Sequence, residues 1–128
     1  MQNKILIVDD ALFMRAMLKK ILKEAGYTQI FEAANGVEAC TVYEAEKPDV
    51  VLMDISMPEM NGIEALKAIV GEDPDAVVVM CSAVGQEAMI LEAVQSGALD
   101  FIVKPFKAEQ IVQAVETAFY KKRGGDHI

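Results

Sequence analysis

The order of elements in this chain predicts an α/β fold, a doubly wound five-stranded parallel sheet built from five βα units. Short apolar runs alternate with amphipathic segments along all 128 residues. The runs are continuously apolar, as in strands buried on both faces, and Gly or Pro lies at most junctions between segments. Alternation of this kind places helices on both faces of a parallel sheet, joined by right-handed crossovers.

The first units follow from local signals. The run Lys4-Ile5-Leu6-Ile7-Val8 predicts a strand, and apolar residues at helical spacing after it, such as Phe13 and Met17, predict a helix that Gly26 ends. A weaker apolar run follows, and Asn35-Gly36 turns the chain into the next helix. We therefore expect strands over residues 4–8 and 29–34, and helices over residues 12–25 and 37–46.

The later units have stronger strands. Pro48 precedes the run Val50-Val51-Leu52-Met53, Gly97 ends the fourth helix, and Pro105 ends the fifth strand. We expect strands over residues 50–53, 76–81 and 99–103, and helices over residues 63–70, 85–96 and 108–121. Residues 1–123 then form one domain, and residues 124–128 form a tail that is disordered or artificial in origin.

Composition excludes several classes of protein. The formal net charge of -8 argues against a direct nucleic-acid binder, which needs a basic face. No apolar stretch approaches the length of a membrane span, and the N-terminus does not resemble a signal peptide. Cys40 and Cys81 have no metal-ligand spacing and are expected to be small buried hydrophobes. We expect a cytoplasmic protein.

Polar residues follow four of the five predicted strands. They are Asp9-Asp10 after the first strand, Asp54 after the third, Ser82 after the fourth and Lys104 after the fifth. Each has an ordinary explanation alone: Asp10, for example, could cap the first helix. Because the carboxyl ends of parallel strands share one edge of the sheet, where ligands bind in such folds, the residues are expected to converge there.

Three carboxylates at one edge repel each other unless a cation lies among them. Mg²⁺ takes carboxylate oxygens together with waters and phosphate oxygens. With that ion bound, Asp54 is a plausible nucleophile toward phosphorus, while Lys104 supplies positive charge and Ser82 a hydrogen-bond donor. This pattern predicts phosphoryl transfer to an aspartate.

Four segments carry a resemblance to a known family. Ile7-Val8-Asp9-Asp10, Leu52-Met53-Asp54-Ile55-Ser56-Met57-Pro58-Glu59-Met60-Asn61-Gly62, Ser82-Ala83 and Phe101-Ile102-Val103-Lys104-Pro105-Phe106 are similar, in order and spacing, to the response-regulator receiver family. The resemblance covers nearly the whole chain. It implies a flavodoxin-like fold with strand order 2-1-3-4-5, an order known for such regulators, and a cis Lys104–Pro105 bond.

The resemblance also implies roles for the site residues. Asp54 is the phosphoacceptor, Asp10 binds Mg²⁺ directly, Asp9 binds it mainly through water, and the backbone carbonyl of Ser56 completes the protein ligands. Lys104 contacts the phosphoryl group, Ser82 moves toward it, and Phe101 is the aromatic residue of the switch.

The resemblance further implies partners rather than substrates. The one His, His127, lies in the tail, so a phosphohistidine must come from another protein, a sensor histidine kinase. The chain is then no enzyme beyond its own phosphorylation and dephosphorylation. It acts on a downstream target such as a flagellar motor switch component, as the single-domain chemotaxis members do, and it is a monomer or a phosphorylation-dependent dimer.

Helix 85–96 is apolar over too wide an arc for one buried stripe. We expect Ala88, Leu91 and Val94 to face the sheet. Met89, Ile90 and Ala93 are then exposed and form a partner surface with Phe101 and Val103.

Three alternatives stay open. In the first, the chain is the receiver part of a larger DNA-binding regulator. In the second it is an aspartate-nucleophile phosphatase, and in the third it is a flavin electron carrier. A haloacid-dehalogenase-type phosphatase needs Asp-x-Asp after the first strand, where this chain has Asp9-Asp10-Ala11. A flavodoxin-like carrier needs a hydroxyl- and glycine-rich phosphate loop there, which Ala11-Leu12-Phe13-Met14 does not supply.

Overall fold

The computed structural model describes residues 3–57 and 60–124 and contains the expected alternation of strands and helices. The strands are β1 (Lys4–Val8), β2 (Gln29–Ala33), β3 (Val50–Asp54), β4 (Val78–Ser82) and β5 (Asp100–Val103). The helices are α1 (Leu12–Glu24), α2 (Gly36–Glu46), α3 (Gly62–Glu72), α4 (Glu87–Gln95) and α5 (Ala108–Lys122). Relative to the sequence prediction, β4 and α4 each begin later in the chain.

Some predicted features fall outside this description. Pro58 and Glu59 of the motif after β3 lie outside the described residues, and so does His127 with the rest of the tail beyond Gly124. Across the two described ranges, no helix combines the length and the apolar character that a membrane span requires.

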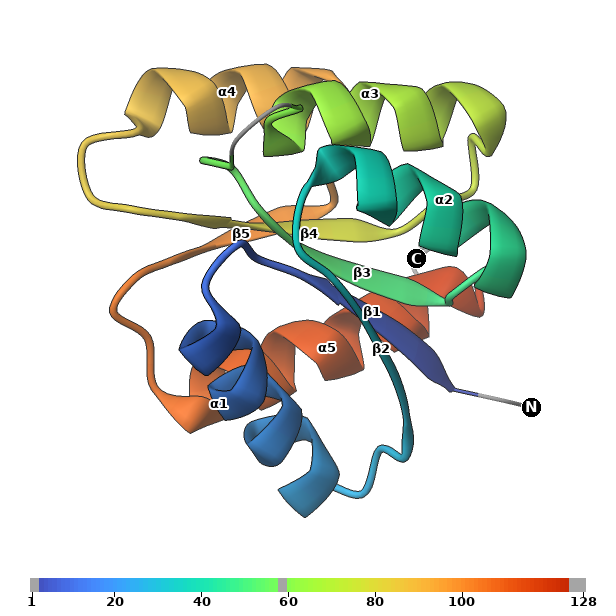
Figure 1. Ribbon diagram of the computed structural model, residues 1–128, viewed down its shortest axis with the longest axis vertical. Helices are drawn as coiled ribbons and strands as arrows, with labels where there is room; N and C mark the ends of the chain where they lie inside the picture. The colour runs from blue at the N-terminus through green and yellow to red at the C-terminus, as the bar shows by residue number, and fades with distance from the viewer. Residues whose placement is uncertain (1–2, 58–59, 125–128) are drawn as a thin grey trace.

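The sheet is parallel throughout, in the order β2-β1-β3-β4-β5, which confirms the topology that the resemblance implied. Helices α2, α3 and α4 cover one face, and α1 and α5 cover the other (Figure 1). Strand β2 lies on one side of β1, whereas β3, β4 and β5 lie on its other side, so the direction in which strands are added reverses between β1 and β3. Their carboxyl ends therefore lie side by side at the topological switch point, where sheets of this kind bind ligands.

The core has two parts, one on each face of the sheet. Alternate residues of a strand point to opposite faces. On the α2–α4 side the strands contribute residues such as Val8, Met53 and Met80. On the α1/α5 side they contribute Ile7, Leu52, Val79 and Ile102.

This alternation sets the direction of the residues at the strand ends. Asp9, Asp54 and Lys104 each come two positions after a residue of the α1/α5 side, so they share that side. Ser82 comes two positions after Met80 and therefore belongs to the α2–α4 side.

Candidate functional site

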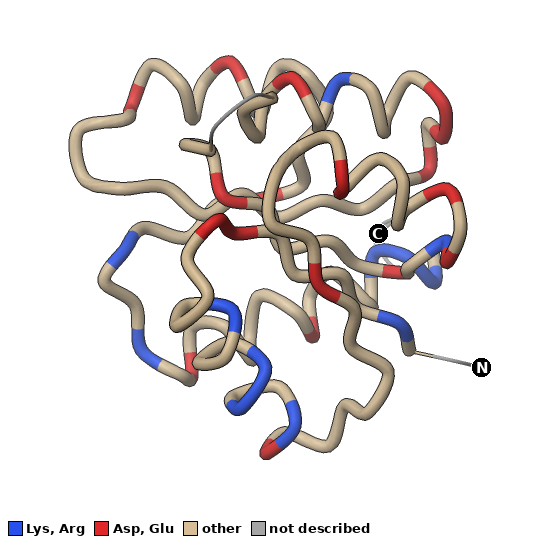
Figure 2. The backbone as a smooth tube through the Cα atoms, in the orientation of Figure 1, with Lys and Arg blue, Asp and Glu red and all other residues tan. Residues whose placement is uncertain are grey.

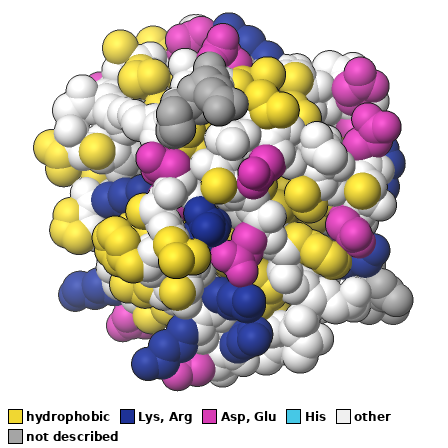
Figure 3. All heavy atoms as spheres, viewed as in Figure 1, with side chains coloured by type: hydrophobic (Ala, Val, Ile, Leu, Met, Phe, Trp, Pro, Cys, Tyr) yellow, Lys and Arg dark blue, Asp and Glu magenta, His cyan; other side chains and the backbone are white. Residues whose placement is uncertain are grey.

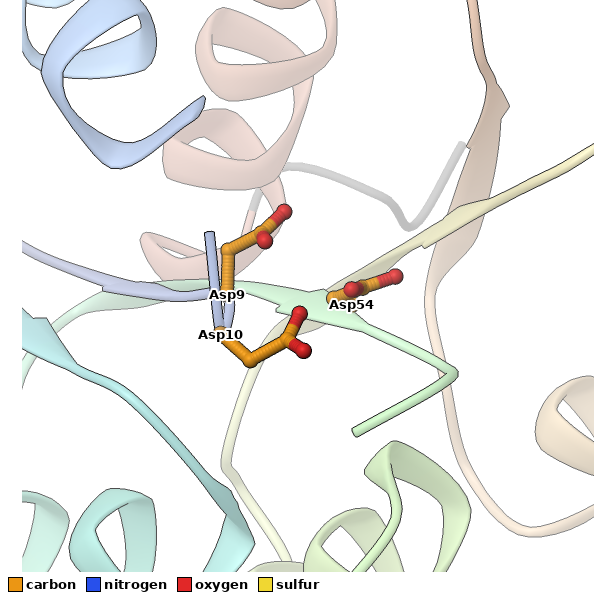
Figure 4. A group of neighbouring side chains, drawn as sticks. All are labelled: Asp9, Asp10 and Asp54. Atoms are coloured by element: carbon orange, nitrogen blue, oxygen red, sulfur yellow. The ribbon is translucent and has the colours of Figure 1, made fainter. Parts of the chain in front are cut away.

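Three carboxylates lie together at the carboxyl edge of the sheet. Asp9 and Asp10 follow β1, and Asp54 is the last residue of the adjacent β3. One oxygen from each lies within 4.8 Å of the others, and Figure 4 shows the three side chains as neighbours, with the Asp10 carboxylate directed toward Asp54. Asp9 and Asp54 are buried, and Asp10 is exposed. The group therefore has two carboxylates fixed inside the protein and a third at its solvent side.

Lys104 reaches the same place from beyond the end of β5. Its Nζ lies 3.0 Å from Asp9 Oδ2 and 3.4 Å from Asp54 Oδ1. The other carboxylate oxygen of Asp9 accepts a hydrogen bond from the Ala11 N–H at 2.9 Å. Lys104 is followed by a cis bond to Pro105, as the resemblance implied. One ammonium group thus faces two of three clustered carboxylates.

The charges at this edge are not balanced. Burial, together with the charges of Asp9 and Asp10, raises the pKa of Asp54 to about 6 although Lys104 opposes the shift. Burial alone lowers the pKa of Lys104, but the hydrogen bond to Asp9 and the negative charges of Asp54 and Asp9 outweigh it, so this pKa is raised overall. Lys104 is therefore firmly cationic, and Asp54 still carries uncompensated repulsion.

These residues fit a hard metal ion. Carboxylate oxygens are the ligands that Mg²⁺ and Ca²⁺ take, and a cation among the three aspartates relieves the repulsion that raises the pKa of Asp54. The aspartate cluster could therefore hold a metal.

Asp10 is not a helix cap. Helix α1 begins after Ala11, and among the described residues no side chain caps it. The Asp9 carboxylate accepts from the Ala11 N–H instead. The ordinary explanation for Asp10 therefore fails, and its exposed carboxylate remains available to a ligand.

Ser82 ends β4 with a buried hydroxyl. Its side chain is inaccessible to solvent, and within the described ranges its Oγ makes no hydrogen bond. A buried, unpaired hydroxyl costs free energy and is uncommon. It lies one position beyond Cys81, which pairs in register with Asp54. A polar group arriving at the strand end can satisfy it.

The segment after Asp54 is held by backbone contacts. The Gly62 N–H donates to the Ile55 carbonyl at 2.8 Å, and a Cβ on Gly62 would lie 2.0 Å from the Asp54 carbonyl oxygen. Only glycine lets α3 begin this close to β3. Ser56 is exposed, and its hydroxyl accepts a hydrogen bond from Gln86 Nε2 at 2.7 Å.

The predicted facing of α4 is wrong. Ala93 is only 1% exposed, and Met89 and Ile90 are half-buried against the core on the α2–α4 side. Leu91 and Val94, expected to face the sheet, are 58% and 47% exposed. A helix that is apolar over a wide arc has two candidate buried stripes, and the small Ala93 lets this helix approach the sheet along the other one.

The rest of the predicted partner surface is exposed. Phe101 and Val103 on β5 are both open to solvent. With the corrected facing of α4, the large apolar residues that α4 and β5 expose are Leu91, Val94, Phe101 and Val103.

Two further features were not predicted. Gln86 contacts both Ser56 and Ala83, and no sequence signal separates such a Gln from an ordinary exposed one. On α1, Leu12, Phe13 and Met17 are exposed although their spacing is that of a buried stripe. Figure 3 shows hydrophobic side chains gathered over α1 above Lys and Arg side chains, and Figure 2 shows basic residues along α1 and acidic ones along α3 and α4.

The chain is similar to proteins of known families along nearly its whole length. Residues 5–116 match the family model described as the response regulator receiver domain. The chain is 53% identical over 115 residues to the chemotaxis protein CheY of Listeria monocytogenes, covering 90% of this chain and 97% of that protein. It is 56% identical over 115 residues to CheY of Thermotoga maritima, covering 90% and 96%.

The structure is also similar to solved structures. A response regulator receiver domain protein from Clostridium thermocellum superposes with a TM-score of 0.89 at 25% identity, covering 94% of this chain and 96% of that one. The segment matched by the family model contains the three aspartates, Ser82 and Lys104. The similarity therefore includes the whole candidate site.

Proposed function

The chain belongs to the response regulator receiver domain family, and from that premise we propose that Asp54 is its phosphoacceptor. Domains of this family are signalling switches of two-component systems, not enzymes in the ordinary sense. One observation supports Asp54 most strongly. It is the buried carboxylate at the switch point, 3.4 Å from the Lys104 ammonium and beside two further carboxylates. The receiver domain on this proposal spans residues 1–123.

We propose Mg²⁺ as the metal of this site, held by Asp9, Asp10, Asp54 and the backbone carbonyl of Ser56. When bound, the ion neutralises carboxylate charge and polarises the phosphoryl oxygens. The donor set supports this choice because Mg²⁺ accepts one or two carboxylates and keeps waters and phosphate oxygens as its other ligands.

In the proposed transfer, a carboxylate oxygen of Asp54 attacks the phosphorus of a phosphohistidine on the partner kinase. The new O–P bond forms as the P–N bond breaks, and the imidazole nitrogen keeps the electron pair and takes up a proton. Asp54 must be ionised to attack, and with a pKa of about 6 it is mostly ionised at neutral pH. Lys104 then contacts a phosphoryl oxygen, and the unpaired Ser82 hydroxyl donates to another.

The output of the switch is a change of surface. Ser82 and Phe101 report the state of Asp54, and the exposed apolar residues of α4 and β5 contact the partner. A receiver of this type has a kinase as phosphodonor and a downstream target. The similarity to chemotaxis proteins over almost their full length supports a chemotaxis-type target, such as a flagellar motor switch component, reached in the cytoplasm. The other proposal is output through the effector part of a larger regulator.

The test is phosphorylation by a small acyl phosphate. Acetyl phosphate with Mg²⁺ is expected to label the protein with one acid-stable, base-labile phosphate, and EDTA is expected to prevent it. Asp54→Asn should abolish the label while circular dichroism shows an intact fold. Asp49→Asn, which alters a carboxylate at the opposite edge of the sheet, is the matched control and should label normally. Stoichiometric labelling of Asp54→Asn would place the acceptor elsewhere.

A further inference from the structure

The side chain of Gln86 joins the two loops that leave the site. Its Oε1 accepts a hydrogen bond from the Ala83 N–H at 2.6 Å, and its Nε2 donates to Ser56 Oγ at 2.7 Å. Ala83 directly follows Ser82, and Ser56 lies two residues after Asp54. One amide therefore connects the segment after the acceptor with the segment after the buried hydroxyl.

This amide is not used to cap its own helix. Gln86 is the N-cap residue of α4, a place where a side chain commonly accepts from the first-turn N–H groups. In the part of the chain that the structure describes, the α4 N-cap makes no such bond. Both polar ends of the Gln86 side chain instead hold the two loops.

The hydrogen bonds of Gln86 affect the switch through the position of Ser82. Its hydroxyl is buried on the α2–α4 side of the sheet, and no group of residues 3–57 and 60–124 forms a hydrogen bond with it. Asp54 comes two positions after Leu52, which packs on the α1/α5 side, so Asp54 belongs to that opposite side. For Ser82 to donate to a phosphoryl group on Asp54, the chain at Ser82 must turn toward the end of β3. Ala83 is the next residue, so this turn also displaces the N–H that donates to Gln86 Oε1.

We propose that Gln86 is a positioning residue that holds the segment after β4 in the resting arrangement and opposes engagement of Ser82. The inference rests on the proposed role of Asp54 as phosphoacceptor. Gln86 is also tied to the first turn of α4, because its backbone carbonyl accepts from the Ile90 N–H at 3.0 Å, so a displacement of Gln86 is passed on to that turn. A change at the site thereby reaches the helix that carries the exposed Leu91 and Val94.

The test compares variants in binding beryllofluoride, a stable analogue of the phosphoryl group, in the presence of Mg²⁺. Gln86→Leu removes both hydrogen bonds at similar volume and should tighten beryllofluoride binding roughly fivefold, as expected from one net hydrogen bond released from the resting state. Ser56→Ala removes only the bond to Ser56 and should tighten binding less. Gln95→Leu, an exposed Gln at the other end of α4, should bind like the wild type.

Two measurements separate this role from a general loss of structure. Mg²⁺ affinity without beryllofluoride should be the same in Gln86→Leu and the wild type, whereas damage to the site would weaken it. In the wild type, the NMR resonances of the Gln86 side-chain NH₂ should move toward those of Gln95 when beryllofluoride binds. This second measurement needs no variant and therefore holds even if Gln86→Leu fails to fold.

The outcomes distinguish the two proposals. A wild type that does not bind beryllofluoride with Mg²⁺ contradicts the proposed function of Asp54. A wild type that binds, while Gln86→Leu binds equally or more weakly, contradicts only the role of Gln86. Side-chain NH₂ resonances of Gln86 that stay unchanged on binding also contradict it.

Discussion

Helices α3 and α4 lie on the same face of the sheet, and each follows a strand that ends in a site residue (Figure 1). They are attached very differently. α3 begins with a capping box in which Asn61 and Glu64 exchange hydrogen bonds, and five of its residues are buried. In the described chain, α4 has no side-chain cap, and its one buried residue is Ala93.

This difference divides the site into a fixed part and a movable part. Regions with few buried apolar contacts open at the lowest free energy. Asp54 is followed by a helix whose first residue packs on the Asp54 carbonyl itself. Ser82 is followed by a helix that contributes little burial and is connected to the site through Gln86. Asp54, which we propose as the phosphoacceptor, therefore belongs to the fixed part, and Ser82 belongs to the looser segment.

The largest expected effect is at the start of α3. Gly62→Ala would place a Cβ 2.0 Å from the Asp54 carbonyl oxygen, and we expect a loss of about 3 kcal/mol or more in the free energy of unfolding. Gly71→Ala lies in the same helix, and apart from the adjoining helix backbone no atom of the described residues lies within 4 Å of its Cβ. It should stabilise by about 0.5–1 kcal/mol, because Ala is the better helix former. Urea unfolding measures both. Similar effects of the two changes would contradict the fixed start of α3.

The same truncation in the two helices should separate them next. Leu66 of α3 is fully buried, while Leu91 of α4 is 58% exposed. Leu66→Ala should cost about 3 kcal/mol of unfolding free energy because it leaves a cavity. Leu91→Ala should change it by less than about 0.5 kcal/mol. A cost for Leu91→Ala close to that for Leu66→Ala would mean that α4 packs as tightly as α3.

A smaller effect is expected at the carboxylate before α3, where a substitution should raise the free energy of unfolding instead of lowering it. The pKa of Asp54, just before the helix, is raised to about 6 by burial and by the charges of Asp9 and Asp10. In the metal-free protein, Asp54 therefore ionises at a lower pH in the unfolded state than in the folded state. The free energy of unfolding accordingly falls as the pH rises from about 4 to about 6. At pH 7 in EDTA, Asp54→Asn should be more stable than the wild type by about 1 kcal/mol, a gain that disappears near pH 4.

Asp73, the C-cap of α3, is the matched control. The Tyr43 hydroxyl donates to it at 2.7 Å, and this bond lowers its pKa. Because the pKa of Asp73 is lower in the folded than in the unfolded state, its ionised form stabilises the fold at pH 7, and this stabilisation is lost as the pH falls. Asp73→Asn should therefore destabilise the protein slightly at pH 7. Urea unfolding at pH 7 and pH 4 measures both variants. Destabilisation by Asp54→Asn in EDTA would contradict the repulsion described for the cluster.

The two helices also show what can be predicted from sequence. Residues at the ends of parallel strands are placed by topology, so the convergence of Asp9, Asp54 and Lys104 follows from the order of the elements alone. The facing of α4 does not, because Met89, Ile90, Leu91 and Val94 offer two apolar stripes and the choice depends on tertiary packing. The same limit applies to α1, where Phe13 has helical spacing but is 72% exposed. Contacts such as that of Gln86 with Ser56, 30 positions apart in the chain, have no local signal.

The smallest expected effect concerns the ion pair that joins the two helices. Lys67 Nζ of α3 lies 2.9 Å from Glu92 Oε2 of α4, with both side chains more than half exposed. A double-mutant cycle with Lys67→Met and Glu92→Gln should give a coupling below about 0.5 kcal/mol that falls further in high salt. The Arg15–Glu32 pair, at 3.0 Å and less exposed, is the control and should couple more strongly. A coupling above about 1 kcal/mol for Lys67–Glu92 would mean that the pair itself holds α4 in place. Helix α4 would then be fixed by its neighbour α3, and its attachment through Ala93 and Gln86 would no longer account for its freedom to move.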